Sequence, residues 1–148
     1  MRQIPFNAFT VQLMKYIIDN HPDRVDEQEF INQRGEVAAN KFAECSRQGM
    51  TVDEAMHQAN ATLYRGLVFS PYHFVRNIIL DELDNSAYTE EDTERFVMQM
   101  LQMTTPTIRA WMEQEEDPDA FQGSASYSLA YNQIKNLITS YIVNNGLQ

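Results

Sequence analysis

Cysteine and long apolar runs are scarce in this chain of 148 residues. Its one cysteine, Cys45, has no partner within the chain, which excludes a disulfide-stapled fold. A helix that spans a bilayer needs about 20 mostly apolar residues, whereas runs such as 67–69 and 78–80 stop after three residues. Polar residues also interrupt the N-terminus, where a secretory signal would have its apolar segment. We therefore expect a cytosolic protein with no membrane segment.

Basic residues are scarce as well. The chain has 11 Lys and Arg against 21 Asp and Glu, a net charge of −10. The imbalance is concentrated in residues 88–122, where the sequence has nine acidic and two basic residues. Such a surface repels the phosphate backbone, and no stripe of Lys or Arg offsets the repulsion, so we expect no direct nucleic-acid binding. An acidic stretch is typical of a solvated surface that aids solubility.

Apolar residues are plentiful enough for a core, with eight Phe, seven Tyr and eight Met. They recur mostly every three or four residues, which predicts amphipathic helices and no strand. The sequence therefore predicts an all-α protein, a multihelical array of about seven helices. The polar stretch 84–87 is typical of a boundary, so we expect two small lobes, residues 1–84 and 85–148.

Caps and stop signals mark four expected helices before residue 84. His21 ends the first, because the residue before Pro22 is pushed out of the α region. Asp26, three residues before Glu29, predicts the start of the second. The remaining signals are left-handed caps at Gly49 and Gly66, a capping box of Thr51 and Glu54 for the third helix, and Ser70–Pro71 for the fourth.

Three more helices are expected after residue 84. Thr89 caps the fifth, and Thr105–Pro106 repeats the pattern of a cap followed by proline, which predicts a separate, shorter sixth helix. Residues 118–126 are expected to form a loop before a last helix at about 127–143. The positions expected to face the core include Val37, Val52 and Met103.

One string of residues resembles a known family. Residues 34–39 read Arg-Gly-Glu-Val-Ala-Ala, and after Gly49 residues 59–70 read Ala-Asn-Ala-Thr-Leu-Tyr-Arg-Gly-Leu-Val-Phe-Ser. With His21–Pro22 and the segment from Phe121, this string resembles DUF1896, an uncharacterised bacterial family often found on conjugative mobile elements of gut bacteria. The resemblance covers residues 9–83 well and 117–147 more loosely. It implies an all-helical fold but no activity and no catalytic residue, because the family has none assigned.

Few residues are spaced for chemistry. Glu54 and His57 have the Glu-x-x-His spacing of di-iron bundles, but the second such pair is missing. The histidines and Cys45 lack zinc-site spacing, and a buried thiol is the expected state of Cys45. Ser70 is explained by helix capping and has no nucleophile elbow around it. The sequence thus predicts no catalytic residue, no metal site and no cofactor.

Aromatic residues crowd the connector 65–72, where a polar loop is usual. One interpretation is a buried connector in which Arg65 bonds helix-end carbonyls. The other is a recognition loop that presents Tyr64, Arg65 and Tyr72, since Tyr and Arg are enriched at binding hot spots. A second set with two interpretations, core packing or an adaptable groove, is Met98, Met100, Met103 and Met112.

These features predict a non-enzymatic protein-interaction module, an accessory of a mobile element, that contacts an unknown protein partner through Tyr64, Arg65 and Tyr72. The alternative is an acidic nucleic-acid mimic that occupies a DNA-binding protein, which the charge of residues 88–122 motivates. A second alternative is an enzyme whose carboxylates assemble only in three dimensions, with strongly shifted acid pKa values in one cleft.

Overall fold

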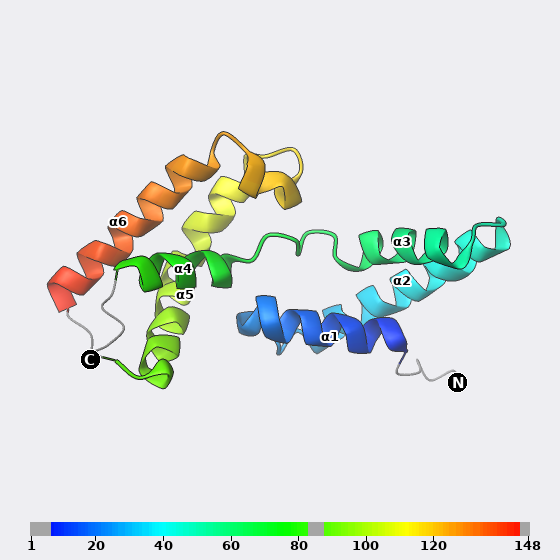
Figure 1. The fold of residues 1–148 in the computed structure, drawn as a ribbon, viewed down its shortest axis with the longest axis horizontal. Coiled ribbons are helices and arrows are strands. Elements are labelled where there is room, and N and C mark those ends of the chain that lie inside the picture. The colour runs from blue at the N-terminus through cyan, green and yellow to red at the C-terminus, as the bar shows by residue number, and fades with distance from the viewer. Residues whose placement is uncertain (1–6, 83–87, 146–148) are drawn as a thin grey trace. The chain divides into compact units, whose positions relative to one another are not determined.

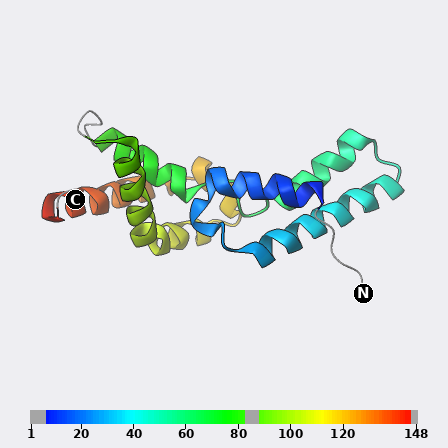
Figure 2. The ribbon, with the colours of Figure 1, turned by 90° about the horizontal axis from the view of Figure 1, so that it is seen from below.

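The computed structural model describes residues 7–82 and 88–145, and all regular structure in these two ranges is helical. The predicted all-α fold is therefore confirmed (Figures 1 and 2). The elements are α1 (Ala8–Asn20), α2 (Gln28–Arg47), α3 (Val52–Leu63), α4 (Pro71–Glu82), α5 (Glu90–Glu113) and α6 (Tyr127–Asn145), with short 3-10 helices η1 (Pro22–Arg24) and η3 (Pro118–Gly123).

The chain divides into two compact units, an N-terminal unit Met1–Val68 and a C-terminal unit Phe69–Gln148. The polar stretch 84–87, where we expect the boundary, lies outside the described residues. The division differs from that expectation in the place of the fourth helix. Because α4 packs on α5 and α6, it shares the core of the C-terminal unit.

The N-terminal unit is built on an antiparallel pair of helices. α2 and α3 lie side by side, joined by a tight turn in which Gly49 has a φ of 91°, as predicted (Figure 2). α1 packs on α2, and Thr10 of α1 lies directly against Gly35, a buried residue in the middle of α2. The buried apolar side chains are Leu13, Ile17, Ile31, Ala38, Leu63 and Leu67.

An aromatic cluster organises the core of the C-terminal unit. The ring of Phe69 meets those of Phe74, Phe121 and Tyr127 edge-on, with centroids 5.0 to 6.3 Å apart. Edge-to-face pairs of this kind favour a fixed arrangement of rings over a fluid one. Phe121 is fully buried from within η3, so the expected loop 118–126 contains a 3-10 turn that supplies a core residue.

Most predicted helix starts are confirmed by their hydrogen bonds. Thr51 and Glu54 form the capping box, with the two bonds at 2.9 and 3.1 Å. Ser70 and Thr89 cap α4 and α5 through their hydroxyl oxygens. The predicted start at Asp26 is wrong, since α2 begins at Gln28 with no side-chain cap. The 3-10 turn η1 precedes α2, and Arg24 binds the carboxylate of Glu27, which fixes the approach to the helix.

The predicted separate sixth helix is also wrong, because α5 continues unbroken through Pro106 to Glu113. Proline in a helix interior removes a backbone hydrogen bond and costs about 3 kcal/mol. The core outweighs this cost, because buried residues lie on both sides of the proline, Leu101 and Thr104 before it and Ile108 after it. The hydroxyl of Thr104 stays bonded inside the helix by donating to the carbonyl of Met100, 2.7 Å away.

Three apolar residues expected to face the core are exposed instead: Val37, Val52 and Met103. Val52 opens α3 directly after its cap, and Val37 lies about 100° around α2 from buried Ala38. The other three methionines of the set support the core interpretation. Met100 is buried, and Met98 and Met112 pack against the same core.

Candidate interaction surface

The connector after α3 is anchored at its main chain. The hydroxyl of Tyr16 and Nε2 of His21 both donate to the carbonyl of Leu67, at 2.9 and 2.8 Å, with His21 in the tautomer that protonates Nε2. Leu67 and Phe69 are buried, each in the core of its own unit, while the side chain of Val68 between them is exposed. This part of the connector therefore fits the buried interpretation.

Tyr64, the first predicted contact residue, holds α1 against α3. Nε2 of Gln12 donates to the Tyr64 hydroxyl oxygen at 2.7 Å and to Oδ1 of Asn60 at 2.9 Å. The ring of Tyr64 lies on that of Tyr16, with centroids 4.6 Å apart. These contacts give the half-buried Tyr64 a structural role inside the N-terminal unit.

Tyr72, the second predicted contact residue, ties α4 to α5. Its hydroxyl donates to the carboxylate of Glu94, with O···O distances of 2.7 and 2.8 Å. Burial raises the pKa of Tyr72 to about 12, and the Glu94 carboxylate adds to the rise because it stabilises the protonated hydroxyl. The tyrosine is therefore held as a neutral donor at ordinary pH.

Arg34, and not Arg65, bonds the carbonyls at the end of α3, which corrects the sequence-based expectation. Nη1 of Arg34 donates to the carbonyl oxygens of Thr62, Leu63 and Arg65 at 3.3, 3.2 and 2.7 Å. Its guanidinium also lies over a phenyl ring, 4.8 Å from the Phe30 centroid. The one hint in the sequence is that the last turn of α3 lacks a basic residue, so the donor must come from another element.

The side chain of Arg65, the third predicted contact residue, is exposed at the rim of a groove between α2 and α3. The groove has a volume of about 420 Å³. Its lining residues are Val37, Asn40, Lys41 and Glu44 from α2 and Gln58, Ala61, Thr62 and Arg65 from α3 and the residues after it. At about 100° per residue, Val37 and Glu44 lie on the side of α2 away from Gly35, where α1 packs. The groove therefore occupies the face that α1 leaves uncovered.

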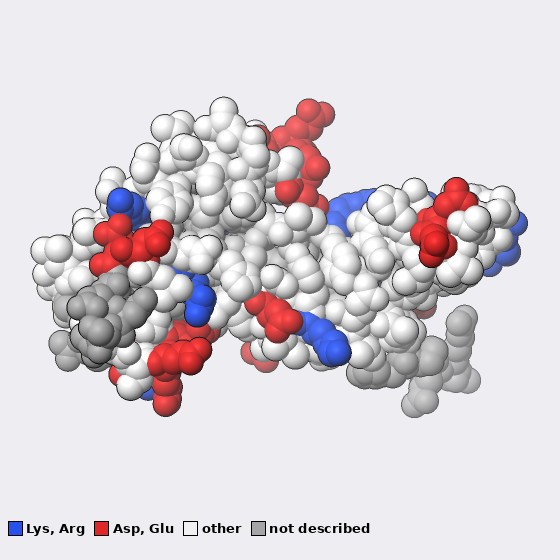
Figure 3. Space-filling view, in the orientation of Figure 1, with Lys and Arg blue, Asp and Glu red and all other residues white. Residues whose placement is uncertain are grey.

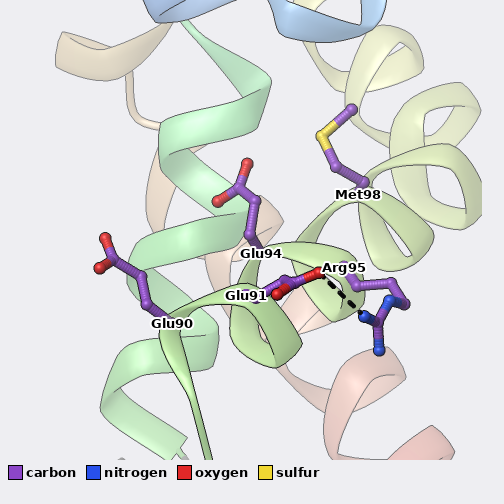
Figure 4. Close-up of a pocket in the computed structure, with 5 residues that line it drawn as sticks. All are labelled: Glu90, Glu91, Glu94, Arg95 and Met98. Carbon is purple, nitrogen blue, oxygen red and sulfur yellow. Dashed lines mark ion pairs between the residues drawn. The ribbon is translucent and has the colours of Figure 1, made fainter.

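A second hollow, of about 570 Å³, lies at the start of α5 (Figure 4). It is lined by Glu90, Glu91, Glu94, Arg95 and Met98. The Glu91 carboxylate faces the Arg95 guanidinium at 3.7 Å, and the Glu94 carboxylate accepts the bond from Tyr72. Carboxylates in a first turn are stabilised by the positive end of the helix dipole, which explains this cluster without a ligand.

The remaining candidate residues have structural surroundings. The Glu54 carboxylate accepts from the backbone N–H of Thr51, which lowers the pKa of Glu54 and turns it toward the helix cap. Ser70 accepts from the backbone of His73, and Cys45 is buried as predicted. Within residues 7–82 and 88–145, no three His, Cys, Asp or Glu side chains are grouped to hold a metal ion. Helices in these same ranges are too short or too polar to span a bilayer.

These features define an all-helical protein made of two small units, with a groove on the first. The chain belongs to the family described as Domain of unknown function (DUF1896), whose model matches residues 2–147. The crystal structure of protein PG0816 from Porphyromonas gingivalis has a similar fold, with a TM-score of 0.78 and 24% sequence identity, over 95% of this chain and 92% of that one. No curated protein matches the chain.

Proposed function

We propose that this protein is a non-enzymatic protein-interaction module that binds a helix of its partner in the groove between α2 and α3. The observation that carries the proposal is the position of Val37. This side chain is 51% exposed in the groove, toward the end where Arg65 lies, and the lining also includes the cation of Lys41. An apolar floor with a polar rim is the arrangement that receives an amphipathic helix.

The charges of the groove suggest how such a helix would lie. Because Arg34 of α2 donates to the carbonyl of Arg65, the C-terminal end of α3 lies beside residue 34 of α2. Glu44 is ten residues further along α2, which places it about 15 Å from Arg34 along the helix axis. Arg65 and Glu44 therefore lie toward opposite ends of the groove. A partner helix with an acidic end facing Arg65 and a basic end facing Glu44 would match both, and its apolar residues at i and i+4 would cover Val37 and Ala61.

Of the three predicted contact residues, the proposal rests on Arg65. The hydroxyls of Tyr64 and Tyr72 are already bonded within the chain, so these residues contribute to the shape of their units. The cytosolic location and the role as accessory of a mobile element are part of the proposal. They rest on the composition and on the family resemblance.

The acidic mimic is less favoured by the arrangement of carboxylates. The acidic residues of 88–122 fall within residues 90–94 at the start of α5 and from residue 113 onward, and residues 95–112 between them contain none. About 18 residues of helix separate the two groups by roughly 27 Å, whereas a mimic needs evenly spaced negative charges. The enzyme alternative has no support at the start of α5, where Arg95 and Tyr72 bind the carboxylates of Glu91 and Glu94.

The test is capture of a partner by the immobilised full-length chain from the native host, followed by calorimetry with the purified partner. The double variant Val37→Asp with Arg65→Glu should weaken binding by at least tenfold, equivalent to about 1.4 kcal/mol. Val11→Asp is the control, because Val11 is also an exposed valine, 41% against 51% for Val37, but lies on α1. Full binding by the groove variant, or loss of binding by the control alone, would refute the groove as the site.

A further inference from the structure

We infer that the outer face of α6 binds a second copy of this chain, in an antiparallel helix pair centred on Asn136. This inference is independent of the groove in the N-terminal unit. It starts from the charge of α6, whose 19 residues include a single ionisable cation, Lys135, and no acid. Lys135 is paired with Glu82 of α4, with Nζ 3.3 Å from the carboxylate.

Apart from Lys135, whose side chain is 43% exposed and paired with Glu82, every exposed residue of α6 is uncharged, in a protein of which 22% is charged. In Figure 3 much of the surface along α6 is white, and a blue and a red group lie beside the middle of the helix. The acidic residues of the C-terminal unit lie elsewhere, above all at the two ends of α5. Because each copy has a net charge of −10, two copies repel each other over most of their surface. Along α6 they can touch without opposing carboxylates.

Apolar side chains remain on this face after the core has been filled. Ala130, Ile134 and Ile138 are the buried residues through which α6 joins the core. On the outer side, Leu129 is 60% exposed, Leu137 40% and Val143 78%. Their burial against a partner would be favourable at about 25 cal/mol per Å² of apolar surface.

The spacing along the face is what selects a second copy. Leu129, Asn136 and Val143 are seven residues apart, so they form one line along the helix, as in a coiled-coil seam. When two such lines pair antiparallel about Asn136, Leu129 of each copy meets Val143 of the other. The two Asn136 amides then face each other, and each can donate an N–H to the oxygen of the other. A buried asparagine in a seam fixes register and orientation.

A strongly charged partner would gain little electrostatic attraction from this face, since the one cation of α6, Lys135, is already paired with Glu82. The seam is instead self-complementary, with apolar residues opposite apolar residues and an amide opposite an amide. Interaxial distances of 8–10 Å are typical of helices that pack in this way.

The first experiment is sedimentation equilibrium of the full-length chain over a range of concentrations, which should show a monomer–dimer equilibrium. Leu129→Glu alone and Val143→Lys alone should each raise the dimer Kd at least tenfold. The double variant should regain most of the affinity, because in the antiparallel register each new acid faces the new base of the second copy. A parallel pair would oppose like charges, and the double variant would then be the weakest. Met103→Glu, at an exposed apolar position on α5, is the control that should leave the dimer unchanged.

Crosslinking tests the register without adding charge. Asn136→Cys should form a disulfide-linked dimer under mild oxidation, since the two positions meet on the two-fold axis. Asn132→Cys should not, because the same position on the second copy is then about 12 Å away along the helix. Cys45 is buried, so it does not compete with the introduced cysteine for disulfide formation. A chain that stays monomeric at about 1 mM and fails to crosslink through position 136 would overturn the inference, as would a dimer that none of the α6 substitutions affects.

Discussion

Gly35 explains part of the string by which the family resemblance is recognised. A Cβ atom added at this position would clash with the hydroxyl oxygen of Thr10 and lie 2.9 Å from its Cα. Because the Cα of Thr10 is a backbone atom, it cannot move aside as a side chain could, and α1 and α2 must separate to admit a methyl group. The absence of a side chain at residue 35 therefore sets how closely the two helices approach.

We expect Gly35→Ala to destabilise the protein by about 1–3 kcal/mol, although alanine is the better helix former by about 1 kcal/mol. Urea unfolding followed by circular dichroism measures the change. Gly123→Ala is the control, because a Cβ at Gly123 meets nothing within 4 Å. Equal stability of the two variants would show that α1 adjusts without cost.

Arg34 has the role at the end of α3 that the sequence predicts for Arg65. Arg34→Ala should cost about 1–3 kcal/mol in unfolding free energy, because three carbonyls at the end of α3 lose their donor. Arg65→Ala should change stability by less than about 0.5 kcal/mol, as is usual for an exposed side chain. The two variants are compared by the same urea titration. A larger loss from Arg65→Ala than from Arg34→Ala would contradict the assignment.

Tyr72 predicts a loss of stability in alkali. Its pKa rises from an ordinary value of 10 to about 12 in the folded chain, so the folded state binds the proton more tightly than the unfolded state. The resulting stabilisation is complete below pH 10 and is lost as the pH rises toward 12. Ultraviolet titration of the phenolate band should show a late-titrating tyrosine that Tyr72→Phe removes. Glu94→Gln should lower the pKa of Tyr72 but leave it above 10, because burial is the larger cause. An unchanged titration in Tyr72→Phe would disprove the assignment.

At the scale of single elements, the signals that sequence reasoning found are those that act within one turn. Thr51 with Glu54, and Ser70 and Thr89, meet their partners three residues away, so a sequence pattern describes the whole interaction. Cys45 was placed in the core by the same local spacing. The role of Arg34 cannot be predicted from a local pattern, because the carbonyls that it binds lie 28 to 31 residues away along the chain. The groove at Val37 cannot be predicted locally either, because the exposure of this face of α2 depends on where α1 packs.

Pro106 shows a local signal that tertiary packing overrides. We expect Pro106→Ala to stabilise the chain by at least 1 kcal/mol, because alanine restores a backbone donor inside α5 at a surface position. Pro71→Ala is the matched control and should have little effect, since proline in the first turn of α4 forgoes no helical bond. Thermal unfolding at 222 nm compares the two. A lower melting temperature for Pro106→Ala would mean that a bend at the proline is needed for the core.

At the scale of the whole molecule, the spacing of apolar residues was enough to predict an all-α protein, but it does not indicate with which helices α4 packs. A polar, turn-rich stretch is the usual mark of a boundary, and residues 84–87 have it. The division of contacts falls instead at Val68 and Phe69, in a stretch rich in apolar residues. The residues on either side of this division both contribute side chains to a core: Leu67 to the core of the first unit and Phe69 to that of the second. Apolar residues are needed there, so the boundary has no polar signature.

The two placements of the boundary predict different folding of fragments. α4 contributes four buried side chains to the C-terminal core: Phe74, Val75, Ile78 and Ile79. Truncation of one such side chain costs about 2–5 kcal/mol, so loss of all four costs about 8–20 kcal/mol, as much as the 5–15 kcal/mol by which a typical domain is stable. We therefore propose that residues 69–148 fold alone and that residues 85–148 do not. Circular dichroism with urea unfolding should show a cooperative transition for 69–148 and none for 85–148. The same transition midpoint in both fragments would place α4 with the N-terminal lobe after all, because its side chains would then add nothing to the stability of α5 and α6.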